Sequence, residues 1–135
     1  MNSAITFFIF NRPAKTKVVL DAIRKAKPSL LFVIADGPRP HVPEDKKKCA
    51  LTRAVIDEVD WDCQVFTKFS DINLGCQKNV ASGMEWVFEN VEETIVLEDD
   101  NLPDPTFFQF CDDLLEYYRN DPRIMSINGQ NIQFG

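Results

Sequence analysis

Five short runs rich in apolar, β-branched and aromatic residues alternate along this chain with stretches of helical periodicity. The runs cover residues 5–10, 30–35, 64–69, 94–97 and 124–127. Strands separated by helices of this length pair in parallel through crossovers, which cover both faces of the sheet. The sequence therefore predicts an α/β fold with a mostly parallel, twisted sheet flanked by helices. A chain of 135 residues with 44% apolar residues suits one such domain over residues 1–135.

Start and stop signals bound the helices between these runs. Pro13 opens a helix over residues 13–27 and Pro28 ends it, while Asp104 and Pro105 predict the cap and first residue of the last helix. The other two helices are expected from about residue 43 and over residues 75–90. Apolar side chains predicted to face the core from these two helices are Leu51, Val55, Val59, Val80, Met84, Val87, Phe88 and Val91.

Three consecutive acids, Glu98, Asp99 and Asp100, end the apolar run at residues 94–97. Neighbouring carboxylates repel one another, so a divalent cation helps to keep such a cluster ionised. The candidate ligands are oxygens and no His or Cys lies beside them, which favours Mg²⁺ or Mn²⁺ over zinc. The alternative is a solvated acidic turn after a strand.

Polar residues follow all five predicted strands. The segments are 11–12, 36–37, 71–75, 98–100 and 128–131. Because the carboxyl ends of parallel strands share one edge of a sheet, these segments should converge where open α/β sheets bind their ligands. Each segment alone is a common turn sequence, so the prediction depends on their convergence.

Charge and composition narrow the function classes. A net charge of -6 disfavours nucleic-acid binding. The apolar stretch at residues 4–10 is too short to span a bilayer and lacks the features of a signal peptide, so we expect no membrane span and a cytoplasmic location. Four scattered cysteines are expected to be reduced.

Taken together, the segments 10–13, 35–37, 73–76, 97–100 and 105–108 resemble the nucleotide-sugar-binding half of GT-A glycosyltransferases. The likeness is strongest to the branch that includes N-acetylglucosaminyltransferase I. The resemblance covers almost the whole chain, with the segments in the same order. The combination of segments is specific, whereas any one of them alone is a weak signal. The resemblance implies a Rossmann-like nucleotide-diphospho-sugar transferase fold.

The acidic triplet matches the "DxD-like" motif of that family. The resemblance implies that Asp100 coordinates Mn²⁺ or Mg²⁺ on the donor diphosphate, that Asp99 contacts the ribose, and that Glu98 lies toward the donor sugar. A cation in that place stabilises the departing nucleoside diphosphate as a Lewis acid.

Other positions match the nucleotide-binding loops of the family. Asp36 matches the acid that binds the edge of the base, while Asn11 and Arg12 match a loop that borders base and diphosphate. Arg12 could equally pair with a surface acid. A weaker match places three residues near the ribose and phosphate: Asn73, Gly75 and Lys78.

The resemblance implies a metal-dependent, inverting glycosyltransferase with a UDP-sugar donor and a glycan acceptor. In such enzymes the general base comes from beyond the segment that matches residues 124–127, and no acid follows Asp121 here. The catalytic base is therefore unknown, and we expect a fragment of a longer transferase whose exposed apolar surface favours a homodimer.

Two alternatives from other classes stay open. One is a non-catalytic nucleotide-sugar-binding module. The other is a Mg²⁺-dependent phosphoryl enzyme of the receiver or haloacid-dehalogenase type, which is disfavoured because those folds need acids after the first strand, where this chain has Asn11 and Arg12. The chain also has neither a P-loop nor a GxGxxG motif.

Overall fold

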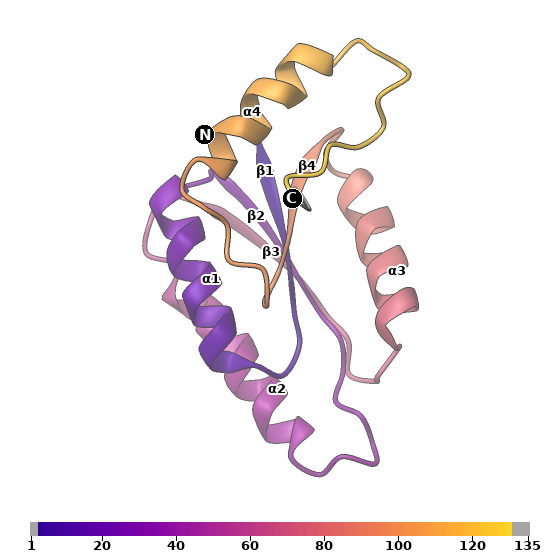
Figure 1. Cartoon of the computed structure of the whole chain (residues 1–135). Coiled ribbons are helices and arrows are strands. Elements are labelled where there is room, and N and C mark those ends of the chain that lie inside the picture. The colour runs from indigo at the N-terminus through magenta and orange to yellow at the C-terminus, as the bar shows by residue number, and fades with distance from the viewer. Residues whose placement is uncertain (1–2, 131–135) are drawn as a thin grey trace, which may run out of the picture.

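The computed structural model describes residues 3–130, in which four strands form one parallel sheet (Figure 1). The strands are β1 (Ala4–Ile9), β2 (Leu30–Ala35), β3 (Gln64–Phe69) and β4 (Thr94–Glu98). Their order in the sheet is β3-β2-β1-β4, and every neighbouring pair is parallel. The predicted parallel α/β fold is confirmed at this level, with a Rossmann-like strand order.

Helices cover both faces of the sheet. They are α1 (Pro13–Ala26), α2 (Asp45–Ala54), which continues into the short 3-10 helix η1 (Val55–Glu58), α3 (Cys76–Phe88) and α4 (Phe107–Tyr118). In Figure 1, α1 and α2 lie on one side of the sheet and α3 lies on the other. Within residues 3–130, no helix is both long and apolar enough to cross a membrane.

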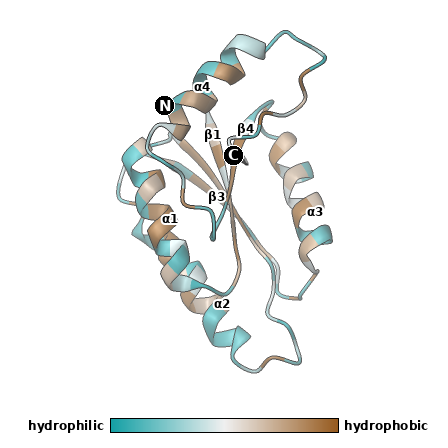
Figure 2. Cartoon of the chain, viewed as in Figure 1, coloured by the Kyte–Doolittle hydropathy of each residue, from teal (hydrophilic) through white to brown (hydrophobic). Residues whose placement is uncertain are grey.

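The core has two layers because successive side chains of a strand point to opposite faces. Ile5, Phe7 and Ile9 of β1 join the layer under α1 and α4, while Phe8 joins the layer under α3. Figure 2 shows β1 as a hydrophobic strand at the centre of the fold. A strand buried on both faces needs a continuous apolar run, which is the pattern seen in the sequence.

The predicted ends of α1 are confirmed within one residue. Pro13 is the first residue of the helix, where its missing N–H costs nothing. Lys27 then takes a left-handed conformation with φ of 49°, and its N–H donates to the carbonyls of Ile23 and Arg24. Pro28 follows and prevents the helix from continuing.

Two apolar side chains predicted to face the core are instead about half exposed: Leu51 and Phe88. The buried stripe of α2 consists of Asp45, Cys49 and Thr52. Leu51 lies beside that stripe, and the change to a 3-10 helix shifts the inward face to Val55 and Ile56. In α3 the buried stripe is likewise part polar, with Asn79, Gly83 and Val87. A periodicity based on apolar residues alone could not find these stripes.

The beginning of α4 lies later than predicted. The helix starts at Phe107, two residues beyond the predicted first residue Pro105. Asp104 does accept hydrogen bonds, but from the N–H and hydroxyl of Thr106 within the preceding turn. The acid therefore stabilises a turn rather than capping the helix.

The predicted strand at residues 124–127 is wrong. This segment has no regular secondary structure, and Met125 is 98% exposed. A strand needs a neighbouring strand with which to form a ladder, and a four-residue apolar run does not say whether one is available. Within residues 3–130, β4 pairs with β1 alone, so the sheet ends there.

Candidate functional site

The carboxyl ends of all four strands meet at one edge of the sheet. The chain leaves β1 through α1 on one face and reaches β4 through α3 on the other, so β1 and β4 flank a topological switch point (Figure 1). Ligands of open α/β sheets bind outside the carboxyl ends of strands at such a point. Seven of the nine predicted site residues lie in the loops after β1 to β4; the other two are Glu98, the last residue of β4, and Lys78, in the first turn of α3.

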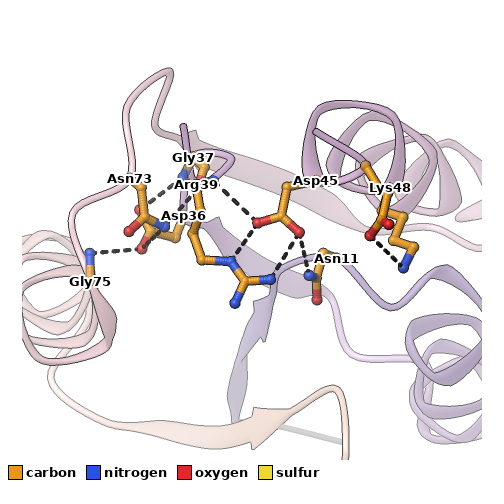
Figure 3. A network of polar contacts seen from close by, with 9 residues as sticks. Asn11, Asp36, Gly37, Arg39, Asp45, Lys48, Asn73 and Gly75 are labelled. Atoms are coloured by element: carbon orange, nitrogen blue, oxygen red, sulfur yellow. Dashed lines mark hydrogen bonds and ion pairs between the residues drawn. The ribbon is translucent and has the colours of Figure 1, made fainter. Parts of the chain in front are cut away.

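Asp36, the first residue after β2, is 6% exposed and holds two loops together. Its Oδ1 accepts from the backbone N–H of Gly37 at 2.8 Å and of Leu74 at 2.7 Å. Its Oδ2 accepts from the backbone N–H of Gly75 at 3.0 Å and from Nδ2 of Asn73 at 3.2 Å (Figure 3). These four bonds fill the acceptor sites of the carboxylate. Asp36 therefore organises the loop that begins α3, which leaves little capacity for the base contact implied by the family resemblance.

The loops after β2 and β3 approach so closely that only glycine fits at position 37. A Cβ atom on Gly37 would lie 2.3 Å from the backbone carbonyl carbon of Ile72. Asn73 strengthens the same contact by donating from Nδ2 to the carbonyl of Gly37 at 2.8 Å. Asn73 is thus part of the scaffold beneath the site.

Arg12 and Asp99 form an ion pair across the switch point. Nη2 of Arg12 lies 2.5 Å from Oδ1 of Asp99, and Nε lies 3.4 Å from Oδ2. Asp99 is 3% exposed, whereas the Arg12 side chain is 42% exposed. The hydrogen bond to Asp99 raises the pKa of the Arg12 guanidinium. Of the two roles considered for Arg12, the structure gives it the pairing with an acid.

Asp100, like Glu98, is an exposed member of the triplet. Its Oδ2 lies 3.5 Å from Nη1 of Arg12, and its side chain is about two fifths exposed. Arg12 thus supplies positive charge to both Asp99 and Asp100, which relieves part of the repulsion within the triplet. Among residues 3–130, no group of three or more His, Cys, Asp or Glu side chains is arranged to hold a metal ion.

The sequence analysis missed Asp45, a buried carboxylate at the same edge. Its side chain is 1% exposed, and it accepts from the backbone N–H of Arg39 at 3.2 Å, from Nε at 2.6 Å and from Nη2 at 3.0 Å. Nδ2 of Asn11 donates to the same carboxylate at 2.8 Å (Figure 3). The Arg39 hydrogen bonds hold the pKa of Asp45 far below its usual range. An acid in the first turn of a helix gave no sign of this role, because Asn11 comes from a distant loop and Arg39 reaches the carboxylate only once the loop before α2 has folded.

Arg53 of α2 was also missed. Its Nη2 donates to the carbonyls of Asp36 at 3.1 Å and of Ser70 at 2.7 Å, which ties α2 to the ends of β2 and β3. The guanidinium lies 5.0 Å from the ring centroid of Phe69. Arg53 therefore stabilises the carboxyl edge by holding the ends of these two strands. No feature of the sequence pattern predicted this role.

The beginning of α3 forms an open hollow of about 490 Å³ lined by residues 74–78 and Ala81. Gly75 precedes the helix with φ of 83°, a conformation that favours glycine. Lys78 is exposed in the first turn. The N-terminus of a helix attracts anions, so this hollow suits a phosphate or carboxylate group.

The last predicted segment, residues 128–131, does not join this edge. A Cβ atom on Gly129 would lie 2.2 Å from the ring of Phe107, so this part of the chain packs against the beginning of α4. Because no strand forms at residues 124–127, nothing directs the segment to the carboxyl edge. Asn131 lies outside the described residues.

A larger groove, of about 560 Å³, lies away from this edge between α1 and the segment from Leu102 to Asp112. None of the predicted site residues lines it. Its size alone does not make this groove the functional site. The carboxyl edge of the sheet is the better candidate, because charged side chains from several loops converge there.

Comparisons of the chain with protein-family models, curated proteins and solved structures found no match.

Proposed function

We propose that this chain is the donor-binding domain of a metal-dependent, inverting glycosyltransferase that takes a UDP-sugar and transfers the sugar to a hydroxyl of a glycan. The observation that carries the proposal is the meeting of Arg12 with Asp99 and Asp100 at the switch point between β1 and β4. A cationic side chain and free carboxylate oxygens at such a point suit a ligand that carries both phosphate groups and a divalent cation.

The residues fit Mn²⁺ or Mg²⁺ through Asp100. This carboxylate is accessible, whereas that of Asp99 is buried and engaged by Arg12. Mg²⁺ commonly binds through one or two carboxylates, with substrate phosphates and water as its other ligands, so a preformed cage of acids is not required. When bound, the cation would stabilise the negative charge of the leaving nucleoside diphosphate.

The chain's own residues would supply the other parts of the site. Arg12 is half exposed and can donate to phosphate oxygens. The open hollow at Gly75 and Lys78 offers helix N-terminal amides and a positive charge. Asn11 and Asp36 hold the loops in place through bonds within the protein, as does Asn73. Glu98 is exposed at the end of β4 and is the residue that the resemblance places toward the sugar.

Calorimetric titration of UDP with Mn²⁺ and with a chelator tests the proposal. We expect UDP and Mn²⁺ to bind with positive coupling in the wild type, each tightening the other by the same factor. Asp100→Asn keeps the size of the side chain but removes its charge, so it should abolish the coupling. Equal UDP affinity in the wild type and the variant, with and without Mn²⁺, would refute the metal-dependent role of Asp100.

Stability measurements provide the control for that variant. Asp100 is exposed and 3.5 Å from Arg12, so Asp100→Asn should change the free energy of unfolding by no more than about 0.5 kcal/mol. A non-catalytic binding module would show the same coupling but neither hydrolysis nor transfer of the sugar by the full-length protein.

A further inference from the structure

Arg39 and Arg12 are held in the same way at the sheet edge. Each guanidinium binds a nearly fully buried aspartate side-on, through Nε and Nη2: Arg39 binds Asp45, and Arg12 binds Asp99. Each arginine side chain is nevertheless about two fifths exposed. The arrangement leaves Nη1 of both arginines directed away from the buried acid.

The two ion pairs are connected by consecutive residues of one loop. Asn11 donates to Asp45, and the next residue, Arg12, donates to Asp99. The loop after β1 therefore lies between the two pairs. Because the four interacting side chains come from three loops and the start of α2, the fold brings both guanidinium groups to the same carboxyl edge.

Arg39 differs from Arg12 in the state of Nη1. Nη1 of Arg12 lies near Asp100, whereas within residues 3–130 no acceptor forms a hydrogen bond to Nη1 of Arg39. The ring of Phe10 lies 5.6 Å from the Arg39 guanidinium carbon and restricts it further. Arg39 is thus a cationic group with a fixed orientation and an unused donor at the ligand-binding edge.

Stability alone explains this arrangement poorly. Burying a carboxylate carries a desolvation cost, and replacing a buried ion pair by apolar residues is often neutral or stabilising. A guanidinium that is already fixed loses less conformational entropy when it binds a planar or tetrahedral anion. The fixed and partly exposed guanidinium therefore suits the binding of an anion, in addition to what the pair contributes to the stability of the loop.

We propose that Arg39 binds a phosphate group at the carboxyl edge of the sheet and that Asp45 is its positioning residue. In so far as the phosphate belongs to a nucleoside diphosphate, the inference rests on the proposed function. Neither residue was among those expected to contact a ligand. With Arg12, Arg39 would give the edge two arginines, so diphosphate should bind more tightly than monophosphate or nucleoside.

Calorimetric titration with inorganic pyrophosphate, in the presence of a chelator, tests the inference without metal or base. Removing one charge-assisted hydrogen bond from the ligand should weaken binding about 10- to 100-fold, and we expect this for Arg39→Gln. Arg39→Lys keeps the charge but not the side-on pair, so it should bind pyrophosphate several-fold more weakly than the wild type. Asp45→Asn retains Arg39 but removes the carboxylate that orients its guanidinium. The loss of pyrophosphate affinity should therefore be intermediate.

Arg119→Gln is the matched control, because Arg119 pairs with Glu93 and Glu116 outside the carboxyl edge. It should leave pyrophosphate affinity unchanged. Circular dichroism melting checks that each variant folds, and if Arg39→Gln does not fold, the comparison of Arg39→Lys with wild type decides. Wild-type affinity in a folded Arg39 variant, or no pyrophosphate binding by the wild type, would overturn the inference. Pyrophosphate binding that depends on Arg39 without any coupling of UDP to Mn²⁺ would support the inference and refute the metal-dependent transferase.

Discussion

Replacing Asp36 by alanine should destabilise the protein strongly even when no ligand is present. The carboxylate accepts from the backbone N–H groups of Gly37, Leu74 and Gly75 and from the side chain of Asn73. The variant would leave three backbone donors without a partner in two loops that are partly closed to water.

The size of the effect follows from these four bonds. A hydrogen bond contributes about 1 kcal/mol net, and more when one partner is charged, so the loss should be about 3–5 kcal/mol. Water can reach part of the loop, which keeps the value below the sum for four fully buried charged bonds. The loss is a large share of the total of about 5–15 kcal/mol typical of a domain. At about 3–4 °C per kcal/mol for a domain of this size, the melting temperature should fall by roughly 10–20 °C.

Urea denaturation without ligand measures this change. Asp71→Ala serves as the matched control, because Asp71 is an exposed acid in the loop after β3 that Asp36 contacts, and its removal should change stability by less than about 0.5 kcal/mol. Asp36→Asn should lie between the two, since an amide keeps one acceptor oxygen but presents N–H groups to Asn73 or Gly75. If Asp36→Ala unfolds like the wild type and instead loses only affinity for UDP, the carboxylate serves the nucleotide and the structural argument is wrong.

Two further perturbations test the contacts that hold the edge together. Gly37→Ala should destabilise by about 1–3 kcal/mol, because its Cβ would meet the backbone of Ile72 and backbone atoms cannot yield as a flexible side chain does. A Cβ on Gly75 would meet open space, so Gly75→Ala should lower the free energy of unfolding by only about 1 kcal/mol, the cost of its positive φ. A lower urea midpoint for Gly75→Ala than for Gly37→Ala would contradict this reasoning. The third prediction concerns pH: the folded protein lowers the pKa of Asp45 from its usual 3.8, so the stability that Asp45 confers is present above about pH 4 and is lost as pH falls toward the lower folded pKa. Urea midpoints of the wild type should therefore decline between about pH 5 and pH 2 more steeply than those of Asp45→Asn. Parallel declines would show that the Arg39–Asp45 pair does not govern the loss of stability at acid pH.

Local sequence patterns predicted the skeleton of this protein. The four strands of the sheet and α1 lie within one residue of their expected positions, because apolar periodicity, prolines and helix lengths act over a few neighbouring residues. The parallel arrangement followed, since a helix between two strands returns the chain to the same end of the sheet. The convergence of the loops after these four strands at the carboxyl edge followed in turn.

The errors arose where a local pattern needed a distant partner. Residues 124–127 have the composition of a strand, but no neighbouring strand pairs with them in the described part of the chain. The inward stripe of α2 contains Asp45, Cys49 and Thr52, so a count of apolar residues selected Leu51 instead.

Only the tertiary structure decided which charges pair. Arg39 and Asp45 are 6 positions apart in the sequence. Asp36 is 39 positions from Gly75 in the loop before α3, and Arg12 is 87 positions from Asp99. Many acids and arginines are available to each other in the sequence, and composition does not rank the combinations. Burial does, because a carboxylate removed from water must find its donors among the few groups that the fold brings within reach.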